Sequence, residues 1–276
     1  ENDDGQRTSM MWNGTAEDYY NLYDVTAKHL KKRFPKIKIG GYAATGLYYV
    51  TDTEEERQSR PRDKYFYDFF HGFMEYIRAH ESPIDFFSWH SYREPKKLID
   101  EGIWVREQLV KYGYENVESH LNEWNPPSRR TRDVDSIHGA EVAAIMLGCQ
   151  NIGVDMLMIY DARIDGSLYS AFFVPSVSGG CLSHAYYSFA AFSALYRLGT
   201  QVGLECDTDG VFAVAATNGK RNAVVISNIS GADQPLEICG VDLIDARWYL
   251  IDRRRLLSWS PELKEIKNNT VVLVEF

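Results

Sequence analysis

Short apolar segments alternate with longer amphipathic segments over most of the chain, and this alternation restricts the fold more than any other feature. Apolar segments near residues 38, 86, 119 and 156 have the length of strands and recur every 33 to 48 residues. The segments between them repeat at helical spacing. The first begins with Thr15 and Asp18, which resemble a capping box, and ends before Pro35. One helix between successive strands predicts a parallel sheet.

The expected strands of this sheet are 37–42, 84–92, 117–124 and 154–163, and the expected helices are 15–34, 61–80, 94–113, 134–151 and 181–198. After about residue 203 the pattern changes to strands only, separated by Asn-Gly, Ser-Gly and similar turn signals. These later strands are expected at 210–217, 221–229, 235–240, 246–252 and 270–276. The sequence therefore predicts two domains, an α/β domain over 1–202 and an all-β domain over 203–276.

Composition excludes several classes of protein. The chain has 276 residues and a net charge of -9, and its one dense basic run, 253–255, is interpreted as a solvated face, so no nucleic acid partner is expected. No apolar run approaches the roughly 20 residues of a membrane span, so no membrane partner is expected. The chain opens with Glu1 rather than Met, which leaves the cellular compartment open.

The cysteines match neither a zinc site nor a dense disulfide framework. Cys149, Cys181, Cys206 and Cys239 are 32, 25 and 33 residues apart, whereas zinc ligands come in close pairs. We interpret them as free thiols, mostly buried.

Polar side chains occupy the ends of three successive expected strands. They are His90 and Tyr92, then Asn122 and Glu123, then Tyr160, Asp161 and Arg163. Four β/α units are half of a (β/α)8 barrel or an open doubly wound sheet, and no glycine-rich phosphate loop follows any strand. A barrel places its active site at the carboxyl ends of its strands, which is where these residues fall.

Glu123 is the strongest candidate for chemistry. It either pins a loop to Arg129 or Arg130, or it acts on a substrate. Glycoside hydrolysis needs two carboxyl groups, hydrogen-bond partners for the sugar hydroxyls and an aromatic floor for the ring. Neighbouring strands supply the last two in Trp89, His90, Tyr92, Asn122, Trp124 and Tyr160.

Several motifs resemble glycoside hydrolase family 39 and its clan A relatives. They are DFFSWHSY at 85–92, HLNEW at 120–124, YDAR at 160–163 and the segment 10–43 that begins MMWNGT. The resemblance implies the C-terminal part, about strands five to eight, of a (β/α)8 TIM barrel, followed by a β-sandwich-like domain. The first half of that barrel would precede residue 1.

The resemblance also implies an activity: a retaining glycosidase, similar to β-xylosidases, that uses no cofactor or metal. It implies that Glu123 is the nucleophile. It implies that Glu1 is the acid/base, because Glu1 lies in register before Trp12-Asn13-Gly14-Thr15; Asp3 or Asp4 is the alternative. His90, Tyr92, Asn122, Trp124, Tyr160, Asp161 and Arg163 are then expected to bind a carbohydrate, a xyloside or a related plant glycan.

Other interpretations remain open at this point. His90 is also typical of a hydrogen-bonded core histidine, and Asp161 with Arg163 of a simple ion pair. His120 lies three residues before Glu123, so strict alternation places it on the opposite face in a structural role. A metal site of His90, His120 and Glu123 lacks a typical ligand spacing.

Two further hypotheses concern the chain as a whole. A half-barrel has two unpaired strand edges, so the isolated chain is expected to be unstable or to self-associate into oligomers, unless a partner supplies the missing strands. It would then be a non-catalytic fragment that binds sugar at most. An open α/β sugar-binding protein is the third alternative; it would lack barrel curvature and a carboxyl partner for Glu123.

Overall fold

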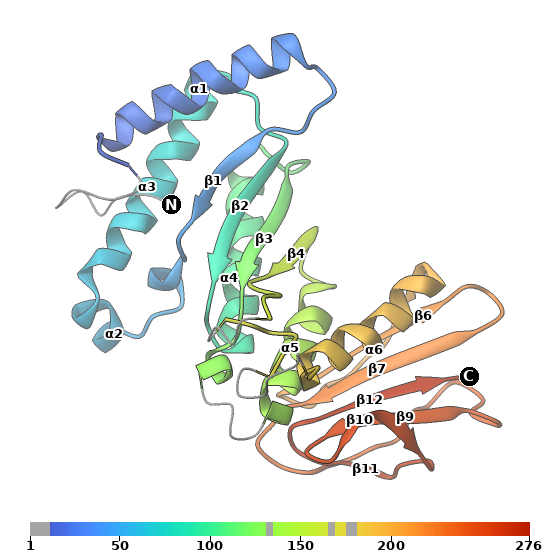
Figure 1. Cartoon of the computed structure of the whole chain (residues 1–276). Coiled ribbons are helices and arrows are strands. Elements are labelled where there is room, and N and C mark those ends of the chain that lie inside the picture. Colours follow the sequence, from blue (N-terminus) through green and yellow to red (C-terminus); the bar gives the residue numbers. More distant parts are fainter. Residues whose placement is uncertain (1–11, 131–134, 165–168, 175–180) are drawn as a thin grey trace. The chain divides into compact units, whose positions relative to one another are not determined.

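A computed structural model describes residues 12–130, 135–164, 169–174 and 181–276. The chain divides into two compact units. The first holds 1–92, 97–124 and 152–158, and the second holds 93–96, 125–151 and 159–276. The fold is mixed α/β, with a parallel sheet and a separate antiparallel sheet (Figure 1).

The parallel sheet has four strands in the order β1-β2-β3-β4 (Figure 1). They are β1 (Gly40–Ala44), β2 (Phe86–Ser91), β3 (Glu118–Trp124) and β4 (Met156–Ile159). The helices between them are α1 (Ala16–Arg33), which precedes β1, α2 (Glu54–Ser59), α3 (Pro61–Ala79) and α4 (Pro95–Lys111). Parallel pairing of β1 with β2 and of β2 with β3 confirms the sequence prediction.

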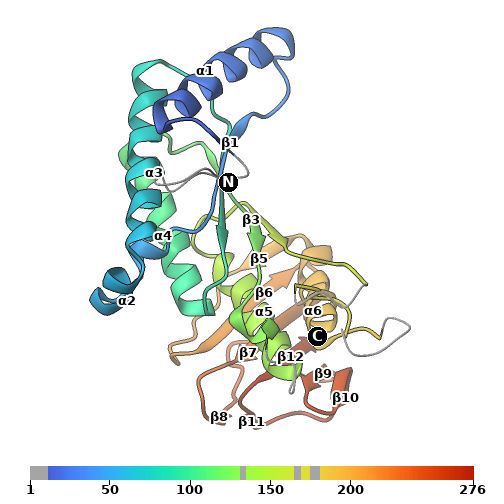
Figure 2. The ribbon, with the colours of Figure 1, turned by 60° about the vertical axis from the view of Figure 1, so that its left-hand side comes forward.

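Helices α3 and α4 cover one face of this sheet (Figure 2). The Phe70 ring centroid of α3 lies 5.3 Å from that of Phe87 in β2, and Phe70 also meets Trp104 of α4 at 4.9 Å. Phe70 and Phe87 are fully buried. The aromatic residues that repeat at helical spacing in α3 are thus core, because a helix buries the face on which its apolar residues repeat.

Sequence patterns place most elements of this unit within a few residues. Thr15 and Asp18 form the expected capping box of α1, and α3 and α4 begin and end close to the expected bounds. The first strand is displaced, because it begins at Gly40 rather than at residue 37. Helix α2 was missed, although Thr53 and Glu56 form a second capping box that the sequence displays.

The antiparallel sheet of the second unit has six strands in the order β10-β9-β12-β7-β6-β5, and a separate pair joins β11 to β8. Figure 2 labels these strands. The strands are β5 (Thr200–Val202), β6 (Val211–Thr217), β7 (Asn222–Asn228), β8 (Gln234–Pro235), β9 (Arg247–Asp252), β10 (Arg255–Ser260), β11 (Glu265–Ile266) and β12 (Thr270–Glu275). Four of the five expected strands appear here, and the expected strand 235–240 is reduced to β8.

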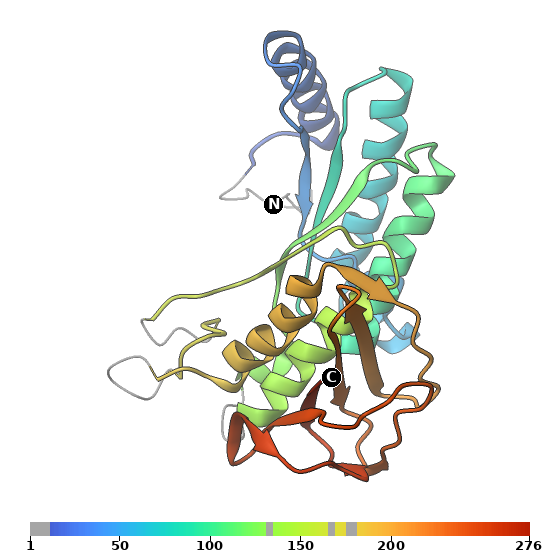
Figure 3. The ribbon, with the colours of Figure 1, turned by 90° about the vertical axis from the view of Figure 1, so that its right-hand side faces the viewer.

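Helices α5 (Asp135–Cys149) and α6 (His184–Leu198) pack on one face of the six-stranded sheet (Figure 3). Ala143, Leu147 and Leu195 of these helices share one apolar cluster with Val225 and Leu273 of the sheet. A second cluster covers the opposite face, where Trp248, Leu250 and Val272 meet Ile266 of β11. The expected domain boundary at 202/203 stays a prediction. The compact units divide the chain at other positions, because α5 and α6 pack with the later strands.

Most of the cysteines lie at the surface. Only Cys149 is buried, whereas Cys181, Cys206 and Cys239 are exposed, so the expectation of mostly buried thiols was wrong. The basic run 253–255 lies at the turn between β9 and β10, where Arg255 pairs with Asp252 at 2.6 Å. Within the described residues, no helix is long and apolar enough to cross a membrane.

Candidate active site

Strand β2 presents two different faces. Phe87, Trp89 and Ser91 are fully buried, and the contact of Phe87 with Phe70 shows that these residues face the helices. Because side chains alternate along a strand, Phe86, Ser88 and His90 face the opposite side of the sheet. His90 therefore lies on the face that α3 and α4 leave uncovered.

A β-bulge in β3 sets the position of Glu123. Trp89 of β2 pairs with Leu121, but the next residue, His90, pairs with Glu123, so Asn122 is the extra residue. A bulge re-aims the side chain that follows it, and bulges are common beside active sites. Here the bulge brings Glu123 level with His90.

Glu123 contacts two of the residues that the sequence grouped with it. The Tyr92 hydroxyl donates a hydrogen bond to Oε1 of Glu123, and His90 Nδ1 lies 3.7 Å from Oε2. The His90 side chain is 8 % exposed and that of Glu123 is 23 % exposed. The carboxylate is thus oriented through both oxygens while part of it stays accessible, which is what a nucleophile or a proton-transfer group needs.

The predicted orientation of His120 was wrong. Its ring stacks on Phe86 with centroids 4.4 Å apart, and Phe86 shares the face of β2 that carries His90. His120 and Glu123 therefore lie on the same face, because the bulge at Asn122 interrupts the alternation. Nε2 of His120 lies 3.0 Å from Oε2 of Glu118, so His120 contacts a residue of its own strand as well as Phe86 of β2.

The two tryptophans beside the site are fully buried. Trp89 donates a hydrogen bond from Nε1 to Ser119 Oγ at 3.0 Å, which makes it a core residue rather than an open floor for a sugar ring. Trp124 at the end of β3 has no exposed surface. Asn122 is partly exposed, and within the described ranges its Oδ1 is buried without a hydrogen-bond partner. Substrate binding by Asn122 and Trp124 stays a prediction.

Tyr160, Asp161 and Arg163 belong to the second compact unit and form a cluster of their own. Nε of Arg163 lies 2.6 Å from Oδ2 of Asp161, and the guanidinium group lies 5.8 Å from the centre of the Tyr160 ring. Asn125 donates hydrogen bonds to the carbonyls of Tyr160 and Tyr169 at 2.8 and 3.0 Å. The ion pair considered from the sequence is present, and a role in binding substrate stays a prediction.

Arg129 and Arg130 were the candidates for a structural partner of Glu123. The Arg129 guanidinium donates to the carbonyls of Asn125 and Pro126, at 3.2 and 3.1 Å, and so closes its own turn. Glu1, the expected acid/base, and the alternatives Asp3 and Asp4 lie outside the described residues.

The described part of the chain holds no group of three or more His, Cys, Asp or Glu that could bind a metal ion. One buried acid near the site was missed by the sequence interpretation. Glu101 of α4 is fully buried and hydrogen-bonded to Ser91, the residue between His90 and Tyr92. The available signal was an acid inside the apolar stripe of Leu98 and Val105.

One family model matches part of the chain. Residues 3–131 match the model of glycosyl hydrolases family 39, so the resemblance inferred from the motifs is confirmed for this part of the chain. No curated protein matches the chain.

Solved structures similar to this chain include several glycoside hydrolases. A glucosidase from Croceicoccus marinus is 18 % identical with a TM-score of 0.68, and the match covers 95 % of this chain and 65 % of that one. A family 39 β-xylosidase from Caulobacter crescentus is 18 % identical with a TM-score of 0.66, covering 94 % and 62 %. A family 86 β-porphyranase from Bacteroides plebeius is 16 % identical with a TM-score of 0.59, covering 94 % and 51 %. The chain therefore spans less than two thirds of these relatives and shares their fold.

Proposed function

We propose that this chain is the C-terminal part of a retaining glycoside hydrolase in which Glu123 is the nucleophile. The observation that carries the proposal is the position of Glu123, partly exposed at the carboxyl end of β3, hydrogen-bonded to Tyr92 and 3.7 Å from His90. Attack by Glu123 on the anomeric carbon forms a covalent glycosyl-enzyme, which water then hydrolyses. The Tyr92 hydroxyl orients the Glu123 carboxylate before the attack, through its hydrogen bond to Oε1.

The second carboxyl group is proposed to be Glu1, on the family resemblance alone. It would protonate the leaving oxygen in the first step and deprotonate water in the second. Retention requires the two carboxyl groups to be about 5–5.5 Å apart, against about 6.5–9.5 Å in an inverting enzyme. A structure of the full-length protein in which the carboxyl group of Glu1 lies farther than this from Glu123 would overturn the assignment.

We infer that the four parallel strands are strands five to eight of a (β/α)8 barrel. The family match and the partial coverage of the solved glycosidases support this, as do the two edge strands, β1 and β4. Met156 and Met158 of β4 are 46 % and 42 % exposed, an apolar surface that further strands would cover. The proposed substrate is a xyloside or a related plant glycan, supported by the likeness to a β-xylosidase.

Glu123→Ala in the full-length enzyme tests the nucleophile. We expect kcat to fall by at least about 10³-fold while the protein stays folded, because the attacking group is lost but no buried charge is stranded. Glu118→Gln is the matched control, since Glu118 lies on the same strand and pairs with Lys38. A mechanism-based fluoroglycoside should label Glu123. Retained activity in Glu123→Ala, or a label on another residue, would contradict the proposal.

A non-catalytic fragment is the second candidate for the chain by itself, favoured by the exposed methionines of β4. The 276-residue chain is then expected to self-associate in sedimentation velocity and to unfold without a sharp transition. A monomer with one sharp unfolding transition would argue against this candidate.

A further inference from the structure

Glu101 is an acid placed where a helix normally carries an apolar residue. It lies in α4 between the buried Leu98 and Val105, and it is fully buried. Acids are almost never fully buried unless their oxygens are paired, because loss of water strongly disfavours an unpaired carboxylate. Glu101 must therefore be hydrogen-bonded where it lies.

Two hydroxyl groups from different segments bond to Glu101, one to each carboxylate oxygen. The Ser91 hydroxyl donates to Oε2 of Glu101 at 2.7 Å, and the Thr51 hydroxyl donates to Oε1 at 3.0 Å. Ser91 is the last residue of β2, and Thr51 follows the short helix at 48–50 in the loop after β1. Glu101 thus joins the end of β2 and the loop after β1 to one helix.

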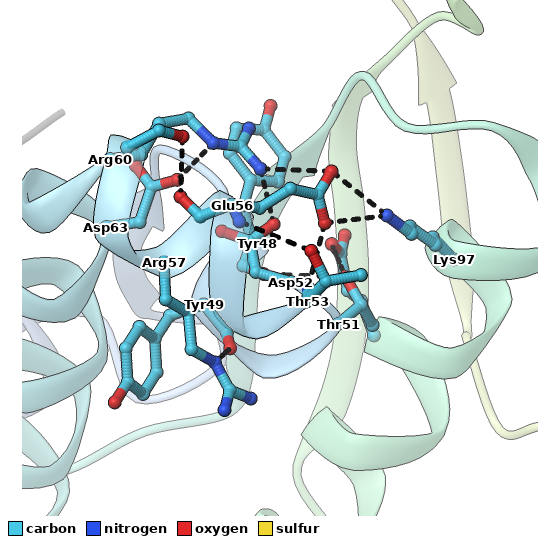
Figure 4. Close-up of polar contacts among 12 residues, drawn as sticks. Tyr48, Tyr49, Thr51, Asp52, Thr53, Glu56, Arg57, Arg60, Asp63 and Lys97 are labelled. Atoms are coloured by element: carbon cyan, nitrogen blue, oxygen red, sulfur yellow. Dashed lines mark hydrogen bonds and ion pairs between the residues drawn. The ribbon is translucent and has the colours of Figure 1, made fainter.

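Charged groups hold the segment that carries Thr51 and α2 together and join it to α4 (Figure 4). Lys97 reaches from α4 to both oxygens of Glu56, at 3.0 and 3.2 Å. Arg60 pairs with the buried Asp52 at 2.5 Å. Lys97 and Glu101 are four residues apart and so lie one turn apart on the same side of α4. This segment and α4 therefore form a fixed support beside the end of β2.

We propose that Glu101 is a positioning residue for the nucleophile, an inference that rests on the proposed role of Glu123. Ser91 points toward α4, so its neighbours His90 and Tyr92 point to the opposite face, where both contact Glu123. The hydrogen bond from Ser91 to Glu101 fixes the backbone at the end of β2, and this backbone sets the positions of the His90 and Tyr92 side chains relative to Glu123. Displacements of about 1 Å at a reacting group are costly, because catalysis depends on a preset geometry.

A purely structural Glu101 would stabilise the fold without affecting Glu123, and the two roles give different results. The test uses the full-length enzyme with Ser91→Ala, Glu101→Ala and Glu101→Gln. Glu107→Ala is the matched control, since Glu107 is an exposed acid on the same helix. We expect Ser91→Ala and Glu101→Ala each to lower kcat about tenfold with little change in KM, because the geometry of attack is altered rather than substrate affinity.

The double variant Ser91→Ala/Glu101→Ala should lose no more than Glu101→Ala, since both changes break the same contact. Glu101→Gln should keep most of the activity, because an amide can still bond to both hydroxyls. Folded single variants with the kcat of the control would overturn the inference. Full additivity of the two changes would also overturn it.

A second readout does not depend on activity. The ¹³Cζ chemical shift of Tyr92, assigned with Tyr92→Phe, reports the hydrogen bond of its hydroxyl group. We expect this shift to move in Ser91→Ala and Glu101→Ala and to stay in place in Glu107→Ala. An unchanged Tyr92 shift in the folded variants overturns the inference whatever Glu123→Ala does, whereas an active Glu123→Ala overturns only the proposed function.

Discussion

The two sheets of this protein differ in how their faces are covered. Aromatic side chains of α3 and α4 bury one face of the parallel sheet, and the other face carries Glu123 with His90. The six-stranded antiparallel sheet is instead buried on both faces, by one apolar cluster that includes α5 and α6 and by another that includes β11. On the parallel sheet, the face without helices can therefore carry reactive side chains such as Glu123. The antiparallel sheet has apolar clusters on both faces and mainly provides packing.

Polar groups follow the same division. In the second unit several buried polar side chains bond to one another or to the backbone, as His138 does with Asn125 at 2.8 Å and Ser227 with the Ala140 carbonyl at 2.8 Å. In the first unit Glu123 keeps part of its surface in solvent. Satisfied buried groups fix a structure, and an accessible carboxylate can react.

Phe70→Ala should produce the largest effect. Phe70 is fully buried between Phe87 and Trp104, so its removal should cost about 3–5 kcal/mol through lost transfer energy and a cavity. Hydrogen exchange should show lost protection in peptides of β2 and α4 and unchanged protection in β7 and β12. Equal loss of protection in both sheets would contradict the prediction, because it would show that Phe70 stabilises the antiparallel sheet as much as the parallel one.

Asp135→Asn should have the next largest effect, and one that depends on pH. Burial raises the pKa of Asp135, but hydrogen bonds from the Nδ1 and backbone N–H of His184, at 3.1 and 2.9 Å, outweigh it and lower the pKa below its usual value of 3.8. A lowered folded-state pKa gives stability that is present above the unfolded-state pKa and is lost as pH falls through the folded-state value.

The Asp135 contribution should be about 1.5–3 kcal/mol near neutral pH, as for other hydrogen bonds to charged groups. Urea unfolding from neutral pH to below pH 4 measures it. Stability of the second unit should fall with acid in the wild type and fall less in Asp135→Asn. Parallel pH profiles would contradict the prediction.

Tyr92→Phe should have the smallest effect in free energy but should act on the site. Loss of the hydroxyl that orients Glu123 should lower kcat of the full-length enzyme about tenfold, which corresponds to about 1.4 kcal/mol, with stability nearly unchanged. Tyr196→Phe is the control, since Tyr196 is exposed on α6. An unchanged kcat would show that Tyr92 serves packing only.

Local patterns were sufficient to predict most elements. Thr15 with Asp18 predicted the start of α1, and helical spacing of apolar residues over 61–80 predicted α3. Both signals lie within a few residues of chain, and helical periodicity depends only on such short spacings. The grouping of His90, Tyr92 and Glu123 was also predicted, because the carboxyl ends of parallel neighbours lie at one edge of the sheet.

Two features of the fold could not be read from the spacing of residues along the chain: the face on which His120 lies and the packing of α5 and α6. Strict alternation put His120 and Glu123 on opposite faces, and one extra residue at Asn122 put them on the same face. A bulge arises from how two strands pair, so neither strand shows it separately. The packing of α5 and α6 on the antiparallel sheet was likewise hidden, since a helix with apolar residues on many sides fits more than one partner.

The sequence by itself determined the alternation of strands and helices, the all-β end of the chain and the identity of the acid at the end of β3. Only the tertiary structure decided that Glu101 reaches both Ser91 and Thr51, which are 10 and 50 residues away in the chain. The physical reason is that backbone propensity and periodicity act over a few residues. Contacts between distant segments exist only once the chain has packed.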